Sequence, residues 1–310
     1  MDRPVIEAVG LIREFGGVTA LDGVGLHVCA GEVLGLLGHN GAGKTTLVDI
    51  LTTLIPPTGG TARVAGCDVV AEGREVRRRI GVAGQFSSVD VRMSGCDNLV
   101  FVARLLGAGR RAARERTERL LEAFGLAEAA GRPAAEYSGG MLRRLDLAAC
   151  LLGSPEAVFL DEPTTGLDPA GRAALWSVVE ELAAEGCAVL LTTQYLEEAD
   201  RLADRITVLS RGRVAAEGTA AELKAGLGSL SVSLSFGSGA DRGAALRVLR
   251  EAGFDPYGDG ERTVVPIDAP RMLAGVVRSL DASGLEPSRI SLDEPTLDDV
   301  FAALTRRPAP

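Results

Sequence analysis

The chain contains few of the residues that form metal centres and disulfide networks. Its 310 residues include five cysteines, none in a Cys-x-x-Cys pair, and two histidines, His27 and His39, which are twelve residues apart. Zinc sites and disulfide frameworks both need clusters of such residues. The sequence therefore argues against both, and scattered cysteines are typical of a protein in a reducing compartment.

Long apolar runs are absent as well. The apolar runs, such as residues 33–37 and 157–160, are short and have the length of a β-strand, whereas a membrane-spanning helix needs roughly 18 apolar residues. The first residues also lack the apolar stretch of a secretion signal. We therefore expect a cytoplasmic protein without membrane spans, which works at a membrane only through another chain.

Positive charge is scarce, and lysine most of all. Lysine and arginine together number 33 against 42 acidic residues, which gives a net charge of −9. A chain that holds nucleic acid usually carries a basic face, so no nucleic acid partner is expected. Only Lys44 and Lys224 are lysines. In a chain that otherwise uses arginine, Lys44 indicates a position that requires a compact ammonium group.

Strand and helix patterns alternate over roughly the first 230 residues. Short apolar runs predict parallel strands covered on both faces, and apolar residues at helical spacing predict the helices between them. The expected strands are 6–9, 24–28, 33–37, 62–64, 80–83, 157–161, 188–192 and 206–209, and the expected helices are 44–54, 169–184 and 196–203. This order predicts an α/β fold around a mostly parallel sheet.

Two further regions depart from that alternation. From about 95 to 152 the strand patterns stop, and three helices are expected to form a helical subdomain, at 98–106, 111–124 and 139–152. A glycine-rich linker lies at 226–229. After it, the order strand, helix, strand, strand, helix, strand predicts a small ferredoxin-like α+β domain over 227–310, with a final helix at 297–304.

Residues 38–45, with the sequence GHNGAGKT, fit the pattern of a phosphate-binding loop between an apolar strand and an apolar helix. Glycines such as Gly38, Gly41 and Gly43 let N–H groups curl around phosphate oxygens. Lys44 reaches the β- and γ-phosphates, and the Thr45 hydroxyl binds Mg²⁺. Because only two lysines exist in the chain, a chance match is rare. The sequence therefore predicts a nucleoside triphosphate site.

A second acidic element supports that site. The apolar strand at 157–161 ends in Asp161, and Glu162 follows it. The carboxyl end of this strand lies at the same sheet edge as the phosphate-binding loop, so Asp161 is predicted to hold Mg²⁺. Glu162 is predicted to be the general base for an attacking water, with a helix cap as the alternative. The letters LDEPT recur at 292–296, where we expect the acids to begin the last helix.

Several further motifs make residues 4–226 resemble the ABC-type ATP-binding proteins. Residues 137–141, YSGGM, look like the ABC signature. Gln85 resembles the Q-loop glutamine, Asp168 the D-loop aspartate, and Phe15 the aromatic residue that stacks on adenine. The resemblance implies a P-loop NTPase that binds ATP and Mg²⁺, with Gln85 both catalytic and at the metal. It also implies nucleotide contacts from Phe15, Asn40, Thr46, Ser138, Gly139, Gly140 and Asp168.

The segments 190–200 and 292–301 narrow the resemblance to the daunorubicin-resistance (DrrA-type) drug-exporter subunits, over nearly the whole chain. This implies ATP-driven efflux of an antibiotic or other hydrophobic compound through a separate DrrB-like integral membrane permease. It also implies a homodimer of ATP-binding subunits at the cytoplasmic face of the membrane. The alternatives are an ABC importer subunit, which has the same site chemistry, and a non-transport ABC ATPase.

Two expectations follow from the resemblance. Gln194 stands where these proteins usually have histidine, and we expect it to be catalytic by positioning the γ-phosphate. Glutamine donates a hydrogen bond but carries no proton near neutral pH, so proton removal would be left to Glu162. The permease is expected to contact apolar residues along 86–106, unless these only pack the helical subdomain. They are Phe86, Val89, Val91, Leu99 and Phe101.

Overall fold

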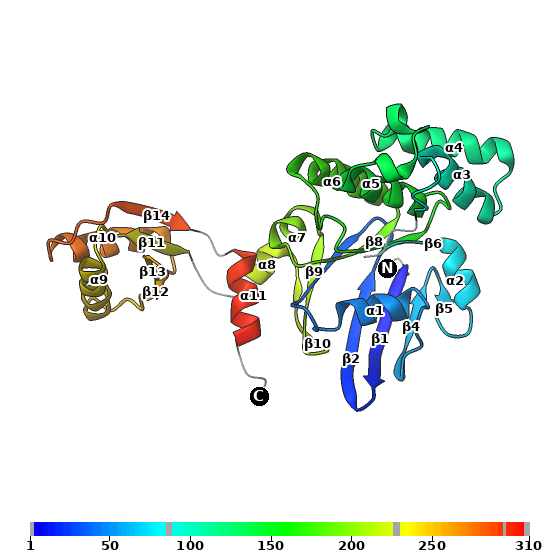
Figure 1. Ribbon diagram of the computed structural model, residues 1–310. Helices are drawn as coiled ribbons and strands as arrows, with labels where there is room; N and C mark the ends of the chain where they lie inside the picture. Colours follow the sequence, from blue (N-terminus) through cyan, green and yellow to red (C-terminus); the bar gives the residue numbers. More distant parts are fainter. Residues whose placement is uncertain (1–2, 85–88, 226–229, 294–295, 307–310) are drawn as a thin grey trace. The chain divides into compact units, whose positions relative to one another are not determined.

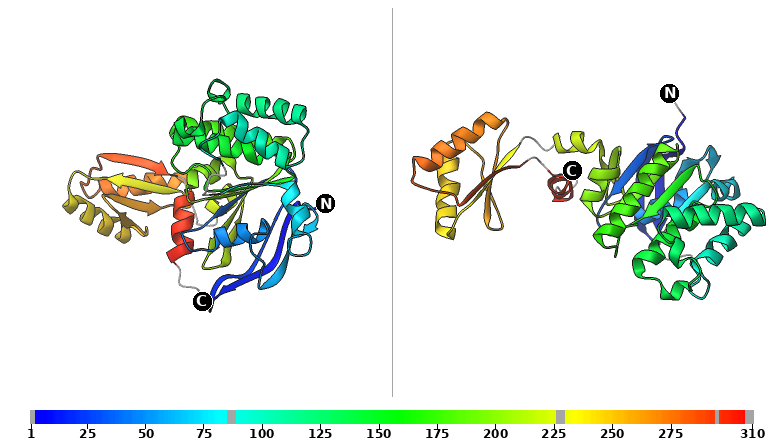
Figure 2. Two further views of the ribbon diagram at one scale, coloured as in Figure 1. Left: turned by 45° about the vertical axis from the view of Figure 1, so that its right-hand side comes forward. Right: turned by 90° about the horizontal axis from the view of Figure 1, so that it is seen from above.

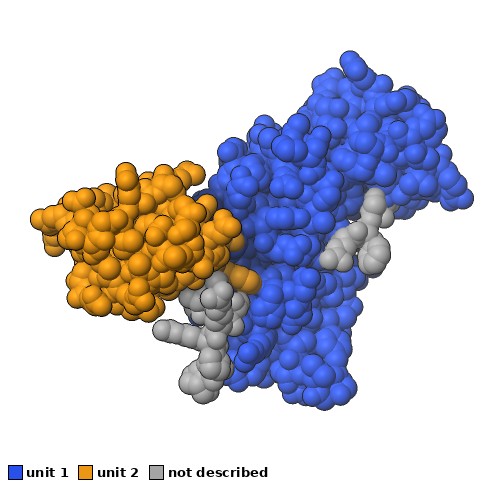
Figure 3. Space-filling model, turned by 60° about the vertical axis from the view of Figure 1, so that its left-hand side comes forward, with its two compact units in different colours: residues 1–220 blue, residues 221–310 orange. Residues whose placement is uncertain are grey.

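The computed structural model describes residues 3–84, 89–225, 230–293 and 296–306, with Asp259 and 302–306 described by backbone alone. The chain divides into two compact units, which Figure 3 colours separately. Unit 1 comprises residues 1–220 and unit 2 residues 221–310. Within the described ranges, none of the helices combines the length and apolarity that a membrane crossing needs.

Unit 1 (Figure 1) is organised around a six-stranded sheet, whose strand order is β10-β9-β3-β8-β7-β6. All neighbouring pairs described are parallel except β9 and β10. Its strands are β3 (Val33–Leu37), β6 (Ile80–Ala83), β7 (Ala157–Asp161), β8 (Ala188–Thr193), β9 (Arg205–Ser210) and β10 (Arg213–Gly218). Strands β3, β7 and β8 are buried along their whole length, which explains their continuous apolar sequences.

The early strands do not join that sheet, which corrects the expectation of a single one. They form a separate antiparallel sheet with the order β2-β1-β4-β5. Its strands are β1 (Ile6–Phe15), β2 (Val18–Val28), β4 (Gly59–Val64) and β5 (Cys67–Asp68). Strands β1 and β2 are longer than predicted, because their added residues are mostly exposed or half-buried and form no apolar run.

Helices cover these sheets and build the subdomain. They are α1 (Lys44–Leu51), α2 (Gly73–Arg79), α3 (Gly95–Leu105), α4 (Arg110–Ala123), α5 (Gly139–Cys150), α6 (Pro169–Ala184) and α7 (Leu196–Leu202), with short 3₁₀ turns at Ala127–Ala129 and Ala134–Glu136. Helix α8 (Ala220–Ala225) follows at the boundary between the two units. Helix α3 contacts both α4 and α5, and Figure 2 shows the three together. The predicted helical subdomain is thus confirmed.

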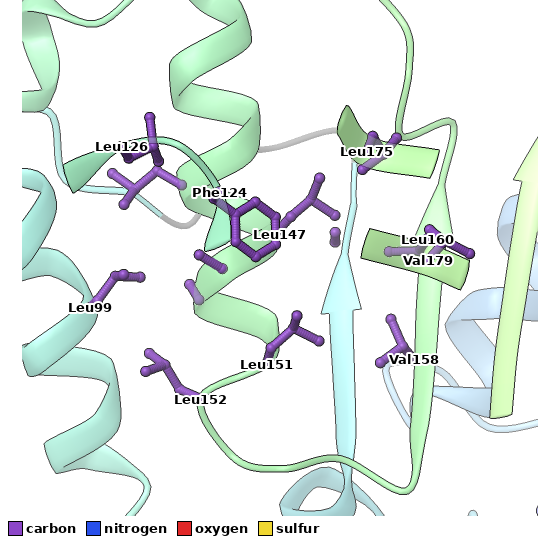
Figure 4. Packing of buried hydrophobic residues seen from close by; sticks show 14 of the residues in the cluster. Leu99, Phe124, Leu126, Leu147, Leu151, Leu152, Val158, Leu160, Leu175 and Val179 are labelled. Carbon is purple, nitrogen blue, oxygen red and sulfur yellow. The ribbon is translucent and has the colours of Figure 1, made fainter. Parts of the chain in front are cut away.

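One apolar cluster joins that subdomain to the parallel sheet. Figure 4 shows side chains from the subdomain packed toward β7 and α6. The fully buried members include Leu99 of α3, Leu145 of α5, Val158 of β7 and Val179 of α6. Because protein interiors are close-packed, this continuous core holds α5 in a defined position against β7.

Unit 2 is an antiparallel sheet with two helices on one face, as the right view of Figure 2 shows. Its sheet order is β12-β13-β11-β14. The chain order is β11 (Ser231–Ser235), α9 (Gly239–Glu251), β12 (Tyr257–Asp259), β13 (Arg262–Pro266), a 3₁₀ turn (Pro270–Met272), α10 (Leu273–Asp281) and β14 (Arg289–Asp293). This is the order of elements and strands of a ferredoxin-like fold.

Helix α11 (Leu297–Arg306) follows β14. The Thr296 hydroxyl accepts a hydrogen bond from the N–H of Asp299 at 3.2 Å. Asp293 lies in β14 and not at the start of the helix, which corrects the expectation for that acid. Glu294 lies outside the described residues.

We predict that unit 1 binds nucleotide without unit 2, because every phosphate-binding motif precedes residue 226. A fragment of residues 1–225, which keeps α8, is expected to bind ATP with the affinity of the full chain. Titration calorimetry measures this, with circular dichroism on both proteins as the control for folding. A folded fragment that no longer binds ATP would contradict the division.

Candidate active site

The candidate site lies where three adjacent parallel strands end together. Strand β8 pairs on one side with β3, where Leu37 is opposite Thr193, and on the other with β7, where Asp161 is opposite Thr192. The phosphate-binding loop follows β3, Gln194 follows β8 and Glu162 follows β7. Pairing in this register therefore brings three sequence motifs, spread over residues 38–194, to one sheet edge.

The phosphate-binding loop requires glycine at two positions where other chain segments approach closely. A Cβ atom at Gly38 would lie 2.7 Å from the carbonyl oxygen of Leu209. Gly43 has φ = 108°, and a Cβ there would lie 2.7 Å from the carbonyl oxygen of Ala20 in β2. Side chains are therefore excluded at both positions, and the loop lies against β2 and β9.

Lys44 is the first residue of α1, and its side chain turns back onto the loop. It is 5% exposed, and its ammonium group donates to the carbonyl oxygens of Gly38 at 2.5 Å and His39 at 3.4 Å. Burial lowers the pKa of Lys44, and the negative charges of Glu162 and Asp161 oppose that shift. The ammonium group therefore lies near enough to both predicted acids for their charges to act on it.

The remaining loop positions are open to a ligand. Asn40, Gly41 and Thr45 are exposed, and Thr46 is half-buried in the first turn of α1. The first N–H groups of a helix have no partner within the helix and bind anions well. This part of the structure is suited to phosphate oxygens.

Asp161 and Glu162 are held by Thr192, a residue that sequence analysis did not single out. The Thr192 hydroxyl donates to Asp161 Oδ1 at 2.5 Å. The N–H of Glu162 donates to the carbonyl and hydroxyl oxygens of Thr192, at 3.0 and 3.1 Å. A hydroxyl at the end of an otherwise apolar strand was the available signal.

Glu162 has φ = 49°, a left-handed conformation that costs a residue with a Cβ about 1–2 kcal/mol. Such strain persists only where the surroundings impose it, and it concentrates at functional sites. The cap of the following helix α6 is the side chain of Asp168, which accepts from the N–H of Gly171 at 2.8 Å. Glu162 is therefore not that helix cap, and the alternative is wrong.

Arg143 of α5 was also missed, and it ties the site to the signature helix. Its guanidinium group donates to the carbonyl oxygens of Gly84 at 2.6 Å and Pro163 at 3.0 Å. It also donates to the carbonyl oxygens of Asp161 at 3.2 Å and Glu162 at 3.4 Å. One planar group thus holds the end of β6 and the backbone around both acids. Two adjacent arginines, with the acid Asp146 shortly after them, in a largely apolar helix were the only signal.

The signature residues form the N-terminus of α5. Ser138 caps the helix by accepting a hydrogen bond from the N–H of Met141 at 3.2 Å. Ser138 and Gly139 are exposed, and Gly140 is close to Leu167 of the segment before α6. The described contacts of these residues are thus with their own helix and with the D-loop segment. They are not with the phosphate-binding loop of the same chain.

Three other predicted site residues are Phe15, Gln194 and Gln85, and the structure describes the first two of them. Phe15 ends β1, is 45% exposed, and carries the guanidinium group of Arg13 at 4.4 Å from its ring centroid. Gln194 is exposed at the end of β8. Gln85 lies outside the described residues, although the preceding Gly84 is bound by Arg143.

Glu198 of α7 is a buried acid that sequence analysis overlooked. It is 1% exposed, and Trp176 of α6 donates to its Oε1 at 3.4 Å. Burial raises its pKa, while hydrogen bonds from Thr193 and Thr164 act in the opposite direction. It therefore links the end of β8 to the segment before α6. Glu198 lies four residues before Leu202, which places both on one face of a helix. That spacing was the signal in the sequence that Glu198 is buried.

Comparisons with known proteins agree with this geometry. Residues 21–165 match the family described as ABC transporter. The chain is 48% identical over 307 residues to the daunorubicin/doxorubicin resistance ATP-binding protein DrrA of Streptomyces peucetius, covering 98% of this chain and 93% of that protein. It is 47% identical over 301 residues to the doxorubicin resistance ATP-binding protein DrrA of Mycobacterium tuberculosis, covering 94% and 90%. The solved structure of an ATP binding subunit of an ABC transporter aligns with a TM-score of 0.66 at 28% identity, covering 71% and 92%.

We predict that Arg143→Lys lowers ATP turnover by roughly tenfold or more, the equivalent of ~1.4 kcal/mol of lost positioning. Lysine keeps the charge but cannot reach several carbonyl oxygens at once. Nucleotide affinity should stay unchanged, since Lys44 is untouched. Steady-state ATPase and nucleotide binding measure both. The control is Arg116→Lys, because Arg116 donates to the Leu151 carbonyl oxygen away from the acids. Equal losses in both variants would contradict a specific role for Arg143.

Proposed function

This chain belongs to the ABC transporter family of ATP-binding subunits, in its daunorubicin-resistance (DrrA) branch, and on that basis we propose that it powers drug export. ATP hydrolysis by this chain drives efflux of an antibiotic or other hydrophobic compound through a separate membrane permease. The observation that carries the proposal is the convergence of Lys44, Asp161 and Glu162 at one sheet edge, in a chain that matches such exporter subunits over nearly its full length.

The residues of the site suit ATP. Lys44 and the loop N–H groups bind the phosphates, and Phe15 offers an exposed ring for stacking on adenine. A hydroxyl at Thr45 and a carboxylate at Asp161 are oxygen ligands of the kind that Mg²⁺ prefers, with Gln85 as a further ligand. When bound, Mg²⁺ supplies charge neutralisation for the β- and γ-phosphates.

Glu162 takes a proton from the attacking water, and Gln194 donates a hydrogen bond to the γ-phosphate. Thr192 and Arg143 hold the backbone of Glu162 so that its carboxylate keeps one orientation. Rigid placement of the base is what makes such a proton transfer efficient. Both roles are proposals for these residues.

We further propose that two copies of the chain form the ATPase, with each nucleotide enclosed between them. Ser138, Gly139 and Gly140 form an exposed helix N-terminus, whose N–H groups and dipole favour a phosphate anion. Their separation from the phosphate-binding loop of the same chain supports a role toward the nucleotide of the partner. Asp168 lies in the adjacent segment, where it caps α6.

The permease of this system is proposed to be DrrB-like and to dock on α3 from the membrane side. Val91, Phe101, Leu105 and Leu106 are each at least 47% exposed, an unusual density of apolar side chains in and near one helix. Leu99 is fully buried, so for that residue the alternative of packing within the subdomain is correct. Val89 packs against the same core, and Phe86 lies outside the described residues. This docking places the chain at the cytoplasmic face.

We predict that Glu162→Gln keeps ATP binding but stops hydrolysis and efflux. The amide removes the base and one negative charge beside the γ-phosphate, so an ATP-bound dimer should accumulate. Gel filtration with light scattering detects the dimer. Accumulation of doxorubicin in cells that also express the permease measures efflux.

The matched control is Glu197→Gln, an exposed acid on α7 outside the site, which should behave as wild type. Wild-type hydrolysis by Glu162→Gln would assign the base elsewhere. The proposal also requires a permease gene beside this one. A periplasmic binding protein encoded there, together with drug uptake in place of efflux, would favour an importer.

We predict that Gln194→Ala lowers turnover by ~1–3 kcal/mol of transition-state stabilisation, the typical value of a hydrogen bond to a charged group. Gln194→His should stay active, and its ATPase rate should change with pH at about pH 6.5, where imidazole titrates. The wild type should show no such dependence from this position. ATPase rates against pH for the three proteins test this. If Gln194→Ala matches the wild type at every pH, Gln194 does not contact the γ-phosphate.

A further inference from the structure

The two edges of the unit 2 sheet differ in how they are protected. Strand β12 is an edge of only three residues with Gly258 at its centre, and short edge strands resist pairing. Strand β14, the other edge, has five residues. Two of them, Ile290 and Leu292, are 41% and 43% exposed. An exposed apolar edge strand is a template for pairing with another chain.

The apolar side chains of β14 lie on the helix-covered face, yet the helices leave them uncovered. Ile290 is opposite Leu234 of β11, and Leu292 is opposite Val232. Those two β11 residues are fully buried, whereas their β14 neighbours are not. Directly opposite residues of an antiparallel pair point to the same face. Helices α9 and α10 therefore cover β11 but leave the edge strand β14 uncovered.

A hollow of about 520 Å³ lies beside the strand on this face. Its walls are mostly apolar and come from α10, from the segment that follows it and from β14. They include Val277, Leu280, Leu285, Pro287 and Ile290. In the part of the chain that the structure describes, β14 is paired to β11 alone. Both the backbone edge and the apolar surface next to it are thus available.

The sequence of β14 is complementary to itself in the antiparallel direction. It reads Arg289-Ile290-Ser291-Leu292-Asp293. A two-fold axis through Ser291 sets Arg289 opposite the partner's Asp293 and Ile290 opposite the partner's Leu292. Each side then contributes one cation, one anion and two apolar side chains, so every cross-strand contact is favourable. A shift of the pairing by one residue removes all of these matches.

We propose that two copies of this chain join their unit 2 sheets through β14, in the register centred on Ser291. The inference rests on the proposed homodimer, for which it names a second contact surface. In this register Arg289 and Asp293 of β14 are complementary to Asp293 and Arg289 of a second copy. This self-complementarity favours a second copy of the chain over an unrelated partner. The contact uses no nucleotide-binding residue, so it forms without ATP, unlike the dimer that encloses nucleotide.

The first test places a thiol on the proposed two-fold axis. In full-length Ser291→Cys the two Cα atoms would be about 4.5–5.5 Å apart, within the range of a disulfide. Under mild oxidation without ATP, most of the chain is expected to become a covalent dimer. Peptide mapping separates the 291–291 link from links through the native cysteines.

The control is Ser288→Cys, an exposed serine just before the strand. In the proposed register its two copies are six residues out of alignment, about 20 Å apart, too far for a disulfide. Equal cross-linking of the two variants overturns the proposal. It is also overturned if Ser291→Cys links in membranes to the permease and not to its own copy.

The second test reverses the charges. Arg289→Asp sets like charges opposite each other twice in the dimer and should raise its dissociation constant by about tenfold. Arg289→Asp with Asp293→Arg restores both pairs and should restore ATP-free dimerisation, measured by sedimentation. Failure of the double variant to recover overturns the register.

These measurements separate this inference from the proposed function. An Arg289→Asp chain carrying Glu162→Gln should still form the ATP-dependent dimer, because its nucleotide site is intact. A chain that dimerises through β14 but never hydrolyses ATP would overturn the proposed function alone. A chain that hydrolyses ATP normally but never links through Ser291→Cys would overturn only the β14 contact.

Discussion

The pairing of β8 between β3 and β7 is the constraint on which the rest of the site depends. Because Leu37 is opposite Thr193 and Asp161 is opposite Thr192, the loop, the acids and Gln194 come to one edge. The Thr192 hydroxyl also donates a hydrogen bond to the Asp161 carboxylate and accepts one from the Glu162 N–H. These bonds fix the two acids beyond what the strand pairing does. A one-residue slip of β8 would turn Thr192 to the other face and remove both contacts.

Much of unit 1 could be predicted because its signals are local. Strands 33–37 and 157–161 were predicted with the bounds that the structure shows, since a fully buried strand is a continuous apolar run. The glycines and Lys44 of the phosphate-binding loop carry a pattern that is specific by itself. The α/β fold with a helical subdomain and a small second unit is thereby confirmed.

The residues that were missed act through tertiary contacts, which no local pattern records. Arg143 looks like an ordinary basic helix residue until β6 and the segment after β7 are placed beside it. Glu198 sits in an acidic run that suggests a solvated helix end, yet packing against Trp176 buries it. The separate antiparallel sheet was missed for a related reason, since long-range pairing decides which sheet an early strand joins.

The four carbonyl oxygens held by Arg143 have a consequence for communication between subunits. Arg143 lies on the helix whose first turn carries Ser138, and it also holds Gly84 at the end of β6. In the proposed dimer, that first turn faces the ATP of the opposite copy. Under this proposal, the helix bound to the end of β6 is the same helix whose first turn contacts the neighbour's nucleotide. The two ATP sites of the proposed dimer would then be coupled through α5, and one transport cycle would involve both copies.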